Sequence, residues 1–338
     1  MTQIKQVIPE AKGEEAKKIY ALFEIVVGKQ YVGKSYTSEK KAQGFLKGYP
    51  EKGIKGNKVI FFDINGEYKK YKTIPVDYAF GVPNEHGIIV DEKTRKPLIN
   101  WIAVFSSSQY KNIEARRVVM NKPDGSLFSI DEINKVLEYV LKYFRIGLFI
   151  LEDPTYYISD TPDRDLTGTL ARVRHKGLHV ICHYQYKSKA LNPRLWNNAT
   201  IIRIHKTEDN FNDYKDRMKG EREIVYIAEI LEKQENKKLF QNATAEQIKH
   251  VDEMPIETFY TIIHKRRTKI CGAFSPNDFY QACETYILQY KKTALFEIAA
   301  EVNDEGKPKY TFKEQLKIRK EELFSTYYGN DINYSIAD

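Results

Sequence analysis

Apolar positions along the chain follow two periods, one typical of strands and one typical of helices. Short apolar runs that end in glycine or polar residues indicate buried strands at 21–28, 57–68, 101–108, 116–120, 145–154, 178–185 and 199–205. Residues 35–46 and 129–144 fit helices instead. The second has apolar residues three or four positions apart, and Ser129 and Glu132 form a capping box. A further polar helix is expected at 163–177.

Strands that alternate with helices predict an α/β fold with a mostly parallel, doubly wound sheet and helices on both faces. This core spans 21–208, and its less regular stretch 69–100 is expected to be an insertion or a hairpin. Residues 1–20 are polar and are expected to form a leader. Residues 209–338 are rich in lysine and glutamate and are predicted to be a mainly helical C-terminal domain. Within it, 259–274 fits a hairpin, and Ser275 and Pro276 begin a helix.

Composition narrows the class of protein. The chain has 338 residues, 42% of them hydrophobic and 13% aromatic, so it can bury a sizeable core. Its net charge of +8 permits nucleic-acid binding without demonstrating it. The three cysteines have no metal-ligand spacing, and an odd number suits a reducing compartment. No apolar run approaches the roughly 20 residues of a membrane helix, and the N-terminus lacks the apolar core of a signal peptide. We therefore expect a cytoplasmic protein without a membrane segment.

The first strand leads into the motif G-x-x-x-x-G-K-S at 28–35. Glycines let such a loop turn tightly and point its N–H groups at phosphate, the lysine reaches the outer phosphates, and the serine meets Mg²⁺. A strand before the loop and a helix after it complete the context. The free positions 29–32 carry bulkier residues than is usual. The predicted nucleotide-binding residues are Gly28, Lys29, Gln30, Tyr31, Val32, Gly33, Lys34, Ser35 and Tyr36.

Two further motifs raise the alternative of a small regulatory GTPase. FFDING fits D-x-x-G, and VVMNKPD fits N-K-x-D, in which Asp124 would read guanine. Only 28 residues lie between Lys34 and Asp63, which leaves no room for the switch loop and extra strand of that family. NKPDGS also fits an ordinary turn. A small-molecule kinase is a further alternative. It would need a mobile, arginine-rich lid over its acceptor pocket, and the only candidate, 69–100, is poor in arginine.

Acidic and amide side chains at the ends of later strands predict the rest of a hydrolytic site. Glu152 and Asp153 follow the apolar run LFIL, beside the strand of the loop, where one acid would hold Mg²⁺ and the other would activate water. Gln185 ends the next strand, where a polar side chain can sense the γ-phosphate or orient water. Arg172 and Arg174 lie between them. Either could be a surface residue or a salt-bridge partner, and ring-forming ATPases often use such an arginine from a neighbouring subunit to neutralise charge on the phosphoryl group.

The order of these motifs resembles the FtsK/HerA superfamily of DNA-pumping P-loop ATPases over roughly 20–206. The resemblance includes Asp63, Gly66, Glu67 and Tyr68 after the second strand, and Arg174, Gly177 and Gln185 around a later one. It implies ATP and Mg²⁺ as cofactors, with Ser35 and Glu152 at the metal, Asp153 acting on water and Gln185 as the γ-phosphate sensor. It also implies that Arg172 or Arg174 serves a neighbouring subunit as an arginine finger. In most members of the superfamily the acidic pair has the order Asp-Glu. The reversed order here leaves the division of labour between the two acids open.

Within that superfamily, a short chain without membrane segments most resembles a viral genome-packaging ATPase. The resemblance implies a homo-oligomeric ring of five or six subunits that moves double-stranded DNA into a capsid through a portal or vertex protein. A Zot-like phage-assembly ATPase and a plasmid or cellular DNA-transfer ATPase are the alternatives. Candidate DNA contacts are Lys265, Arg266, Arg267 and Lys269 in the predicted C-terminal hairpin.

Overall fold

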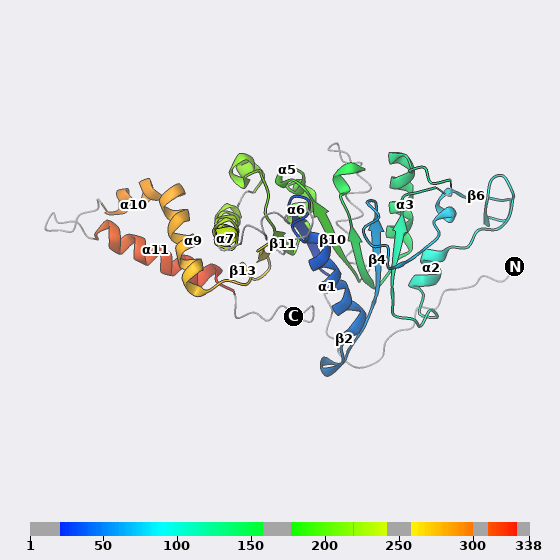
Figure 1. Ribbon diagram of the computed structural model, residues 1–338, viewed down its shortest axis with the longest axis horizontal. Helices are drawn as coiled ribbons and strands as arrows, with labels where there is room; N and C mark the ends of the chain where they lie inside the picture. The colour runs from blue at the N-terminus through cyan, green and yellow to red at the C-terminus, as the bar shows by residue number, and fades with distance from the viewer. Residues whose placement is uncertain are drawn as a thin grey trace.

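The computed structural model describes residues 21–122, 124–157, 177–218, 220–241, 258–299 and 310–329 (Figure 1). Within these residues, one sheet runs in the order β13-β12-β11-β1-β10-β9-β4-β8-β5. Pairing is parallel from β11 to β5 and antiparallel for β12 and β13. The strands are β1 (Phe23–Val27), β4 (Lys58–Asp63), β5 (Lys72–Thr73), β8 (Ala115–Val119), β9 (Gly147–Leu151), β10 (Leu178–Tyr184), β11 (Ile201–Ile204), β12 (Thr261–His264) and β13 (Lys269–Cys271).

Both faces of this sheet are covered, as the continuous apolar strands predict. Alternate residues of β4 enter different clusters: Val59 and Phe61 pack on the side of α1 (Lys34–Lys47), whereas Ile60 and Phe62 pack with α3 (Ile130–Tyr143). The capping box of Ser129 and Glu132 begins α3 as the sequence predicted. The expectation of a mostly parallel α/β sheet with helices on both faces is therefore confirmed.

One predicted strand is wrong. Residues 101–106 form a short helix, α2 (Trp101–Ser106), because Asn100 caps it by accepting from the backbone N–H of Ala103. The helix buries Ile102 and Phe105, three residues apart, and leaves Trp101 39% exposed. Periodicity cannot distinguish a strand from a helix in a short apolar run. Here the cap at Asn100 and the packing of the buried side chains determine that the segment is helical.

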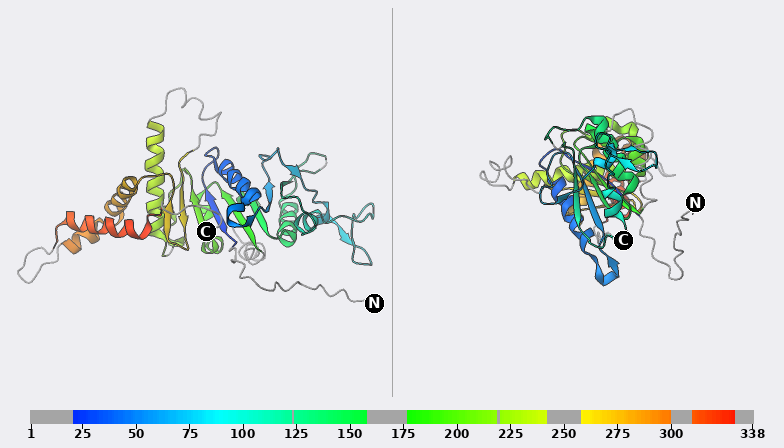
Figure 2. Two further views of the ribbon diagram at one scale, coloured as in Figure 1. Left: turned by 90° about the horizontal axis from the view of Figure 1, so that it is seen from below. Right: turned by 90° about the vertical axis from the view of Figure 1, so that its right-hand side faces the viewer.

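The C-terminal region adds both helices and strands. Helix α7 (Arg222–Gln241) packs on β12 and on α9 (Pro276–Tyr290), and α9 packs on α11 (Phe312–Tyr327). Together with α10 (Lys292–Ala299), α9 and α11 lie at one end of an elongated molecule, and the hairpin of β6 (Val82–Pro83) and β7 (Ile89–Val90) lies toward the other (Figures 1 and 2). The hairpin β12–β13 joins the main sheet beside β11, so the core and the C-terminal region share one sheet.

The remaining described elements are short. They are β2 (Gly48–Tyr49), η1 (Pro50–Lys52), β3 (Ile54–Lys55), η2 (Asp77–Phe80), η3 (Pro154–Tyr156), α5 (Lys187–Ala190), α6 (Pro193–Asn198) and η5 (Phe211–Arg217).

Candidate active site

Glycines, and contacts with His205 and Thr258, determine the shape of the loop between β1 and α1. Gly33 adopts φ 84° immediately before α1, a conformation that favours glycine. A Cβ on Gly28 would lie 2.6 Å from the Cβ of His205, so this position has no space for a side chain. The loop therefore takes the tight path that its motif predicted.

Two side chains from beyond β11 hold the middle of the loop. The carbonyl of Val32 accepts from the Thr258 hydroxyl at 2.9 Å and from Nδ1 of His205 at 3.2 Å. His205 is fully buried and stacks on Tyr260 with ring centroids 4.8 Å apart. Burial, reinforced by nearby positive charges, lowers the pKa of His205 well below its usual value, so the ring is neutral and its Nδ1–H donates to the loop.

Lys34 is the cation at the floor of the loop. Its ammonium donates to the carbonyl of Gly28 and, at 2.6 Å, to the carbonyl of Lys29. Burial lowers the pKa of Lys34, and the acids Glu152 and Asp153 oppose that shift. These bonds are to backbone oxygens of the loop itself, and a phosphate group can replace them.

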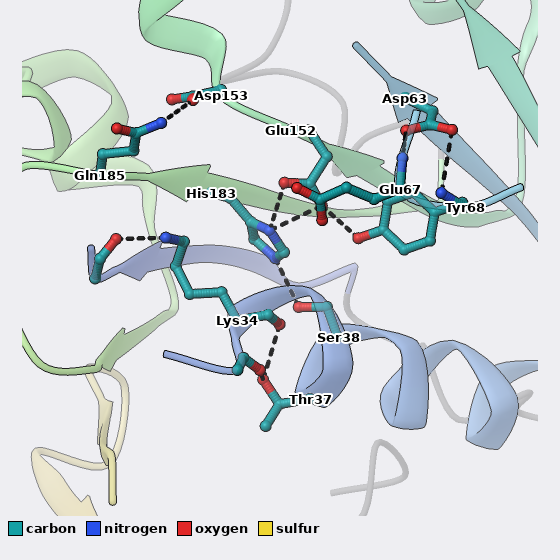
Figure 3. A network of polar contacts seen from close by, with 12 residues as sticks. Lys34, Thr37, Ser38, Asp63, Glu67, Tyr68, Glu152, Asp153, His183 and Gln185 are labelled. Carbon is teal, nitrogen blue, oxygen red and sulfur yellow. Dashed lines mark hydrogen bonds and ion pairs between the residues drawn. The ribbon is translucent and has the colours of Figure 1, made fainter. Parts of the chain in front are cut away.

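Glu152 is the buried acid of the site. It follows β9 and is 3% exposed, and its carboxylate accepts from the Tyr68 hydroxyl and from Nδ1 of His183 at 3.0 Å (Figure 3). Burial by itself would raise the pKa of this carboxyl. The contacts with His183 and Tyr68, together with the charge of Lys34, outweigh burial and lower the pKa below its usual value. Glu152 is therefore an ionised acceptor at neutral pH.

Asp153 faces the same space with different partners. Its backbone adopts φ 47° before Pro154, and its carboxylate accepts from the Thr155 hydroxyl at 3.1 Å and from the Gln185 amide. A non-glycine residue with positive φ is held there by its surroundings. The turn aims the side chain of Asp153 at Gln185 rather than along β9 (Figure 3).

A cavity of about 490 Å³ lies between the loop and these acids. Its lining brings together residues from the loop, from the turn after β4 and from the ends of β9 and β10. They are Gln30, Tyr31, Val32, Gly33, Lys34, Ser35, Tyr36, Asn65, Glu67, Glu152, Asp153, His183 and Gln185. The oxygens of Ser35, Glu152 and Glu67 are hard donors of the kind that Mg²⁺ prefers, so this set fits that ion. Burial, followed by the charge of Glu152, raises the pKa of Glu67, whose carboxylate also bonds the Ser35 hydroxyl.

The structure thus assembles most of the predicted site, with one correction. Strand β10 lies between β1 and β9, so the acidic pair is one strand removed from the strand of the loop rather than beside it. Parallel strands end at the same edge of the sheet, which still brings both acids to the cavity. Gly28 packs against His205 and does not line the cavity. Lys29 borders a smaller hollow with Gln30, Tyr31 and Gln185. Arg172 and Arg174 lie in 158–176, outside the described residues. The helix predicted at 163–177 also lies outside them, except for its last residue.

The basic residues of the β12–β13 turn lie apart from the cavity lining. Lys265 pairs with Glu221 at 2.8 Å, and its ammonium also donates to the carbonyl of Trp196. Lys269 donates to the carbonyl of Ser325 at 2.9 Å. Arg266 and Arg267 are exposed at the turn.

The motifs of the GTPase alternative have structural roles. Asp63 is 1% exposed, pairs with Arg117 and accepts from the backbone N–H groups of Glu67 and Tyr68. Asp124 lies in an exposed turn, accepts from Ser126, and is not part of the cavity lining. The described residues of NKPDGS, 121–122 and 124–126, therefore form a turn, as its composition favoured.

Three residues at or beside the cavity, His183, Tyr68 and Asn65, had no role assigned from sequence. For His183 the available signal was a histidine next to the end of a mainly apolar strand, and for Tyr68 it was its place in the motif after the second strand. The described ranges contain neither a group of three or more histidine, cysteine or acidic residues placed to hold a metal ion nor a helix long and apolar enough to cross a membrane.

Comparison with known proteins gives distant structural matches. No protein-family model matches the chain, and no curated protein matches it either. Among solved structures, it is similar to the genome packaging NTPase B204 from Sulfolobus turreted icosahedral virus 2, with 18% identity over 74% of this chain and 94% of that one, and a TM-score of 0.40. It is also similar to the pCW3 conjugation coupling protein TcpA, with 9% identity over 72% of this chain and 57% of that one, and a TM-score of 0.32. Likenesses this distant assign no function to the chain, which has to come from the site itself.

Proposed function

We propose that this protein hydrolyses ATP to move double-stranded DNA, as the genome-packaging motor of a virus. The observation that carries the hydrolytic part is the single cavity in which Lys34 of the loop faces Glu152 and the bonded pair of Asp153 and Gln185. Phosphoryl transfer needs a phosphate cradle, a metal-holding acid and a residue that orients water. The cavity offers one candidate for each part.

Within this proposal each residue has a separate task. The N–H groups of the loop and Lys34 bind phosphates, and Ser35 and Glu152 would hold Mg²⁺. When bound, Mg²⁺ neutralises charge on the phosphates. Asp153 takes the proton of the attacking water, and Gln185 bonds Asp153 and senses the outermost phosphate. Glu152 is buried whereas Asp153 is only partly buried, which supports this assignment of roles.

The DNA-moving part rests on the resemblance of the motifs and on charge. The net charge of +8 and the exposed arginines of the β12–β13 turn suit a phosphate backbone, which a packaging motor contacts without reading bases. In the proposed motor, 21–208 form the ATPase core, and 209–338 form a C-terminal domain whose strands β12 and β13 extend the sheet of the core. Five or six subunits form a ring in the host cytoplasm and dock at a capsid portal or vertex, and Arg172 or Arg174 of each subunit serves its neighbour.

Hydrolysis of ATP and of GTP, each with and without double-stranded DNA, tests the proposal. We expect ATP-selective turnover that DNA stimulates in the wild type and that Lys34→Ala abolishes. Lys47→Ala, an exposed lysine at the far end of the same helix, is the matched control and should keep the turnover. Guanine-selective turnover, or turnover indifferent to DNA, would contradict the motor. Native mass spectrometry of the same sample gives the number of subunits in the assembly.

A further inference from the structure

His183 joins the helix of the phosphate loop to the buried acid. It is the penultimate residue of β10 and is 1% exposed. Its Nδ1 lies 3.0 Å from the Glu152 carboxylate, and its Nε2 lies 2.7 Å from the hydroxyl of Ser38, on α1 (Figure 3). The ring of His183, which lines the cavity, therefore connects β10, α1 and the end of β9.

The partners of the ring determine which nitrogen carries the proton. An ionised carboxylate only accepts hydrogen bonds, so Nδ1 of His183 must be the donor to Glu152. The Ser38 oxygen already receives the guanidinium of Arg203 at 3.3 Å. Among the described residues, the acceptor within reach of the Ser38 proton is Nε2 of His183. In a neutral ring, Nε2 then accepts from Ser38, and the hydrogen bonds run in one direction, from Arg203 through Ser38 and His183 to Glu152.

Arg203, at the start of this series of hydrogen bonds, is also held in place. Arg203 is 3% exposed and is held by the carboxylate of Glu24 and by the hydroxyl of Thr37. Burying a polar ring is unfavourable unless its nitrogens are satisfied, and both nitrogens of His183 are. An apolar side chain would fill the position on β10 but would leave one side of the Glu152 carboxylate without a donor.

We propose that His183 is a positioning residue for Glu152: as the Nδ1–H tautomer bridging Ser38 and Glu152, it fixes the rotamer of the acid that would hold the divalent cation. Tyr68, in the segment after β4, donates to the same carboxylate, so two donors from the two sides of β9 hold it. Partners of this kind orient metal ligands, and their loss typically costs about 10- to 100-fold in metal affinity or activity. The role of the acid rests on the proposed function, whereas the tautomer and the bridge do not.

Two isosteric substitutions separate positioning from packing. The amide of asparagine lies near the place of Nδ1, whereas the amide of glutamine lies near the place of Nε2. We expect His183→Asn to keep most of the ATP turnover and His183→Gln to lose about 10- to 100-fold, with a matching loss of Mn²⁺ affinity in the presence of ADP, measured by electron paramagnetic resonance. His179→Asn is the matched control, because this buried histidine of the same strand bonds the backbone N–H of Leu22 instead. It should lower stability and leave turnover per folded molecule unchanged.

Nitrogen-15 NMR of the histidine rings in the full-length protein, without nucleotide or metal, gives a readout that does not need hydrolysis. We expect the His183 proton on Nδ1, assigned by its absence in His183→Asn. A proton on Nε2, or equal losses in the asparagine and glutamine variants, would overturn the inference. If the wild type hydrolyses no ATP, the proposed function fails, and the NMR spectrum with the Mn²⁺ affinities still decides the role of His183.

Discussion

The side-chain amide of Gln185 donates a hydrogen bond to the carboxylate of Asp153. The two residues are 32 positions apart in the chain and meet because β9 and β10 are parallel neighbours. Each also borders the cavity that faces Lys34. The strand ends therefore present a carboxylate already oriented by a neutral amide, which is the arrangement that a water-activating acid needs.

Asp153→Asn should remove this acid without changing the shape of the site. We expect kcat for ATP to fall by about 10²- to 10⁴-fold, the usual contribution of a general base, while ATP binding measured by calorimetry is kept. Gln185→Ala should cause a smaller loss. Asp131→Asn, at an exposed acid in the first turn of α3, is the control. Retained turnover in Asp153→Asn together with its loss in Glu152→Gln would reverse the two roles.

Thr258→Val should loosen the phosphate loop. The Thr258 hydroxyl donates to the carbonyl of Val32, and its loss should cost about 0.5–1.5 kcal/mol of stability. Thr261→Val is the control, because the Thr261 hydroxyl is also buried and donates to the carbonyl of Ala228, away from the loop. Urea unfolding should show similar losses in both variants, and only Thr258→Val should weaken ATP binding. Equal ATP affinities would mean that this bond does not shape the loop.

Gly28→Ala should be harmful because of the 2.6 Å approach between the new Cβ and that of His205. Overpacking of this kind costs about 1–3 kcal/mol, and the forced shift would move the loop carbonyls that hold Lys34. Gly125→Ala is the comparison: its Cβ would meet nothing within 4 Å, although its φ of 86° strains an alanine. Both variants should unfold at lower urea concentration, but only Gly28→Ala should lose nucleotide binding.

Glu232 should make the protein less stable as the pH rises. It is 1% exposed on α7, and burial raises the pKa of Glu232 to about 7, against the opposing charge of Lys187. The folded pKa lies above the unfolded value of 4.5. The contribution of Glu232 to the free energy of unfolding is therefore fully present below pH 4.5 and is lost as the pH rises through 7. A tenfold change in the acid dissociation constant is worth about 1.4 kcal/mol, so the loss of stability is on the order of 3 kcal/mol.

Glu232→Gln checks this assignment. The variant should flatten the decline in unfolding free energy between pH 4.5 and about 8, and it should be more stable than the wild type at the upper end of that range. Chemical denaturation at several pH values measures both. An unchanged pH profile would show that Glu232 ionises normally in the folded protein.

Complementation should reveal a finger arginine that acts between subunits. Lys34→Ala and the double variant Arg172→Ala/Arg174→Ala should each be inactive alone. Mixed rings should regain part of the ATP turnover, because a subunit with an intact loop can receive the arginine of a Lys34→Ala neighbour. The two single arginine variants then identify the residue. Mixed rings that form without any recovery would exclude a finger from this segment.

Much of the candidate site followed from local sequence. The motif at 28–35 needs glycine at defined positions, and the apolar runs before Glu152 and Gln185 identify strand ends, so these residues could be assigned to one edge of a parallel sheet. The capping box before α3 was equally local. Each of these features depends on residues within a few positions of one another, which is why a single sequence predicts them.

Tertiary structure decided what depends on residues far apart in the chain. The insertion of β10 between β1 and β9, the helical state of 101–106, and the packing of Gly28 against His205 are settled by contacts that no local pattern contains. The hydrogen bonds from Arg203 through His183 to Glu152 join three strands and a helix. The sequence by itself determined which chemical groups stand at the strand ends. Only the folded sheet determined which of them touch, because strand order and side-chain packing are properties of the whole chain.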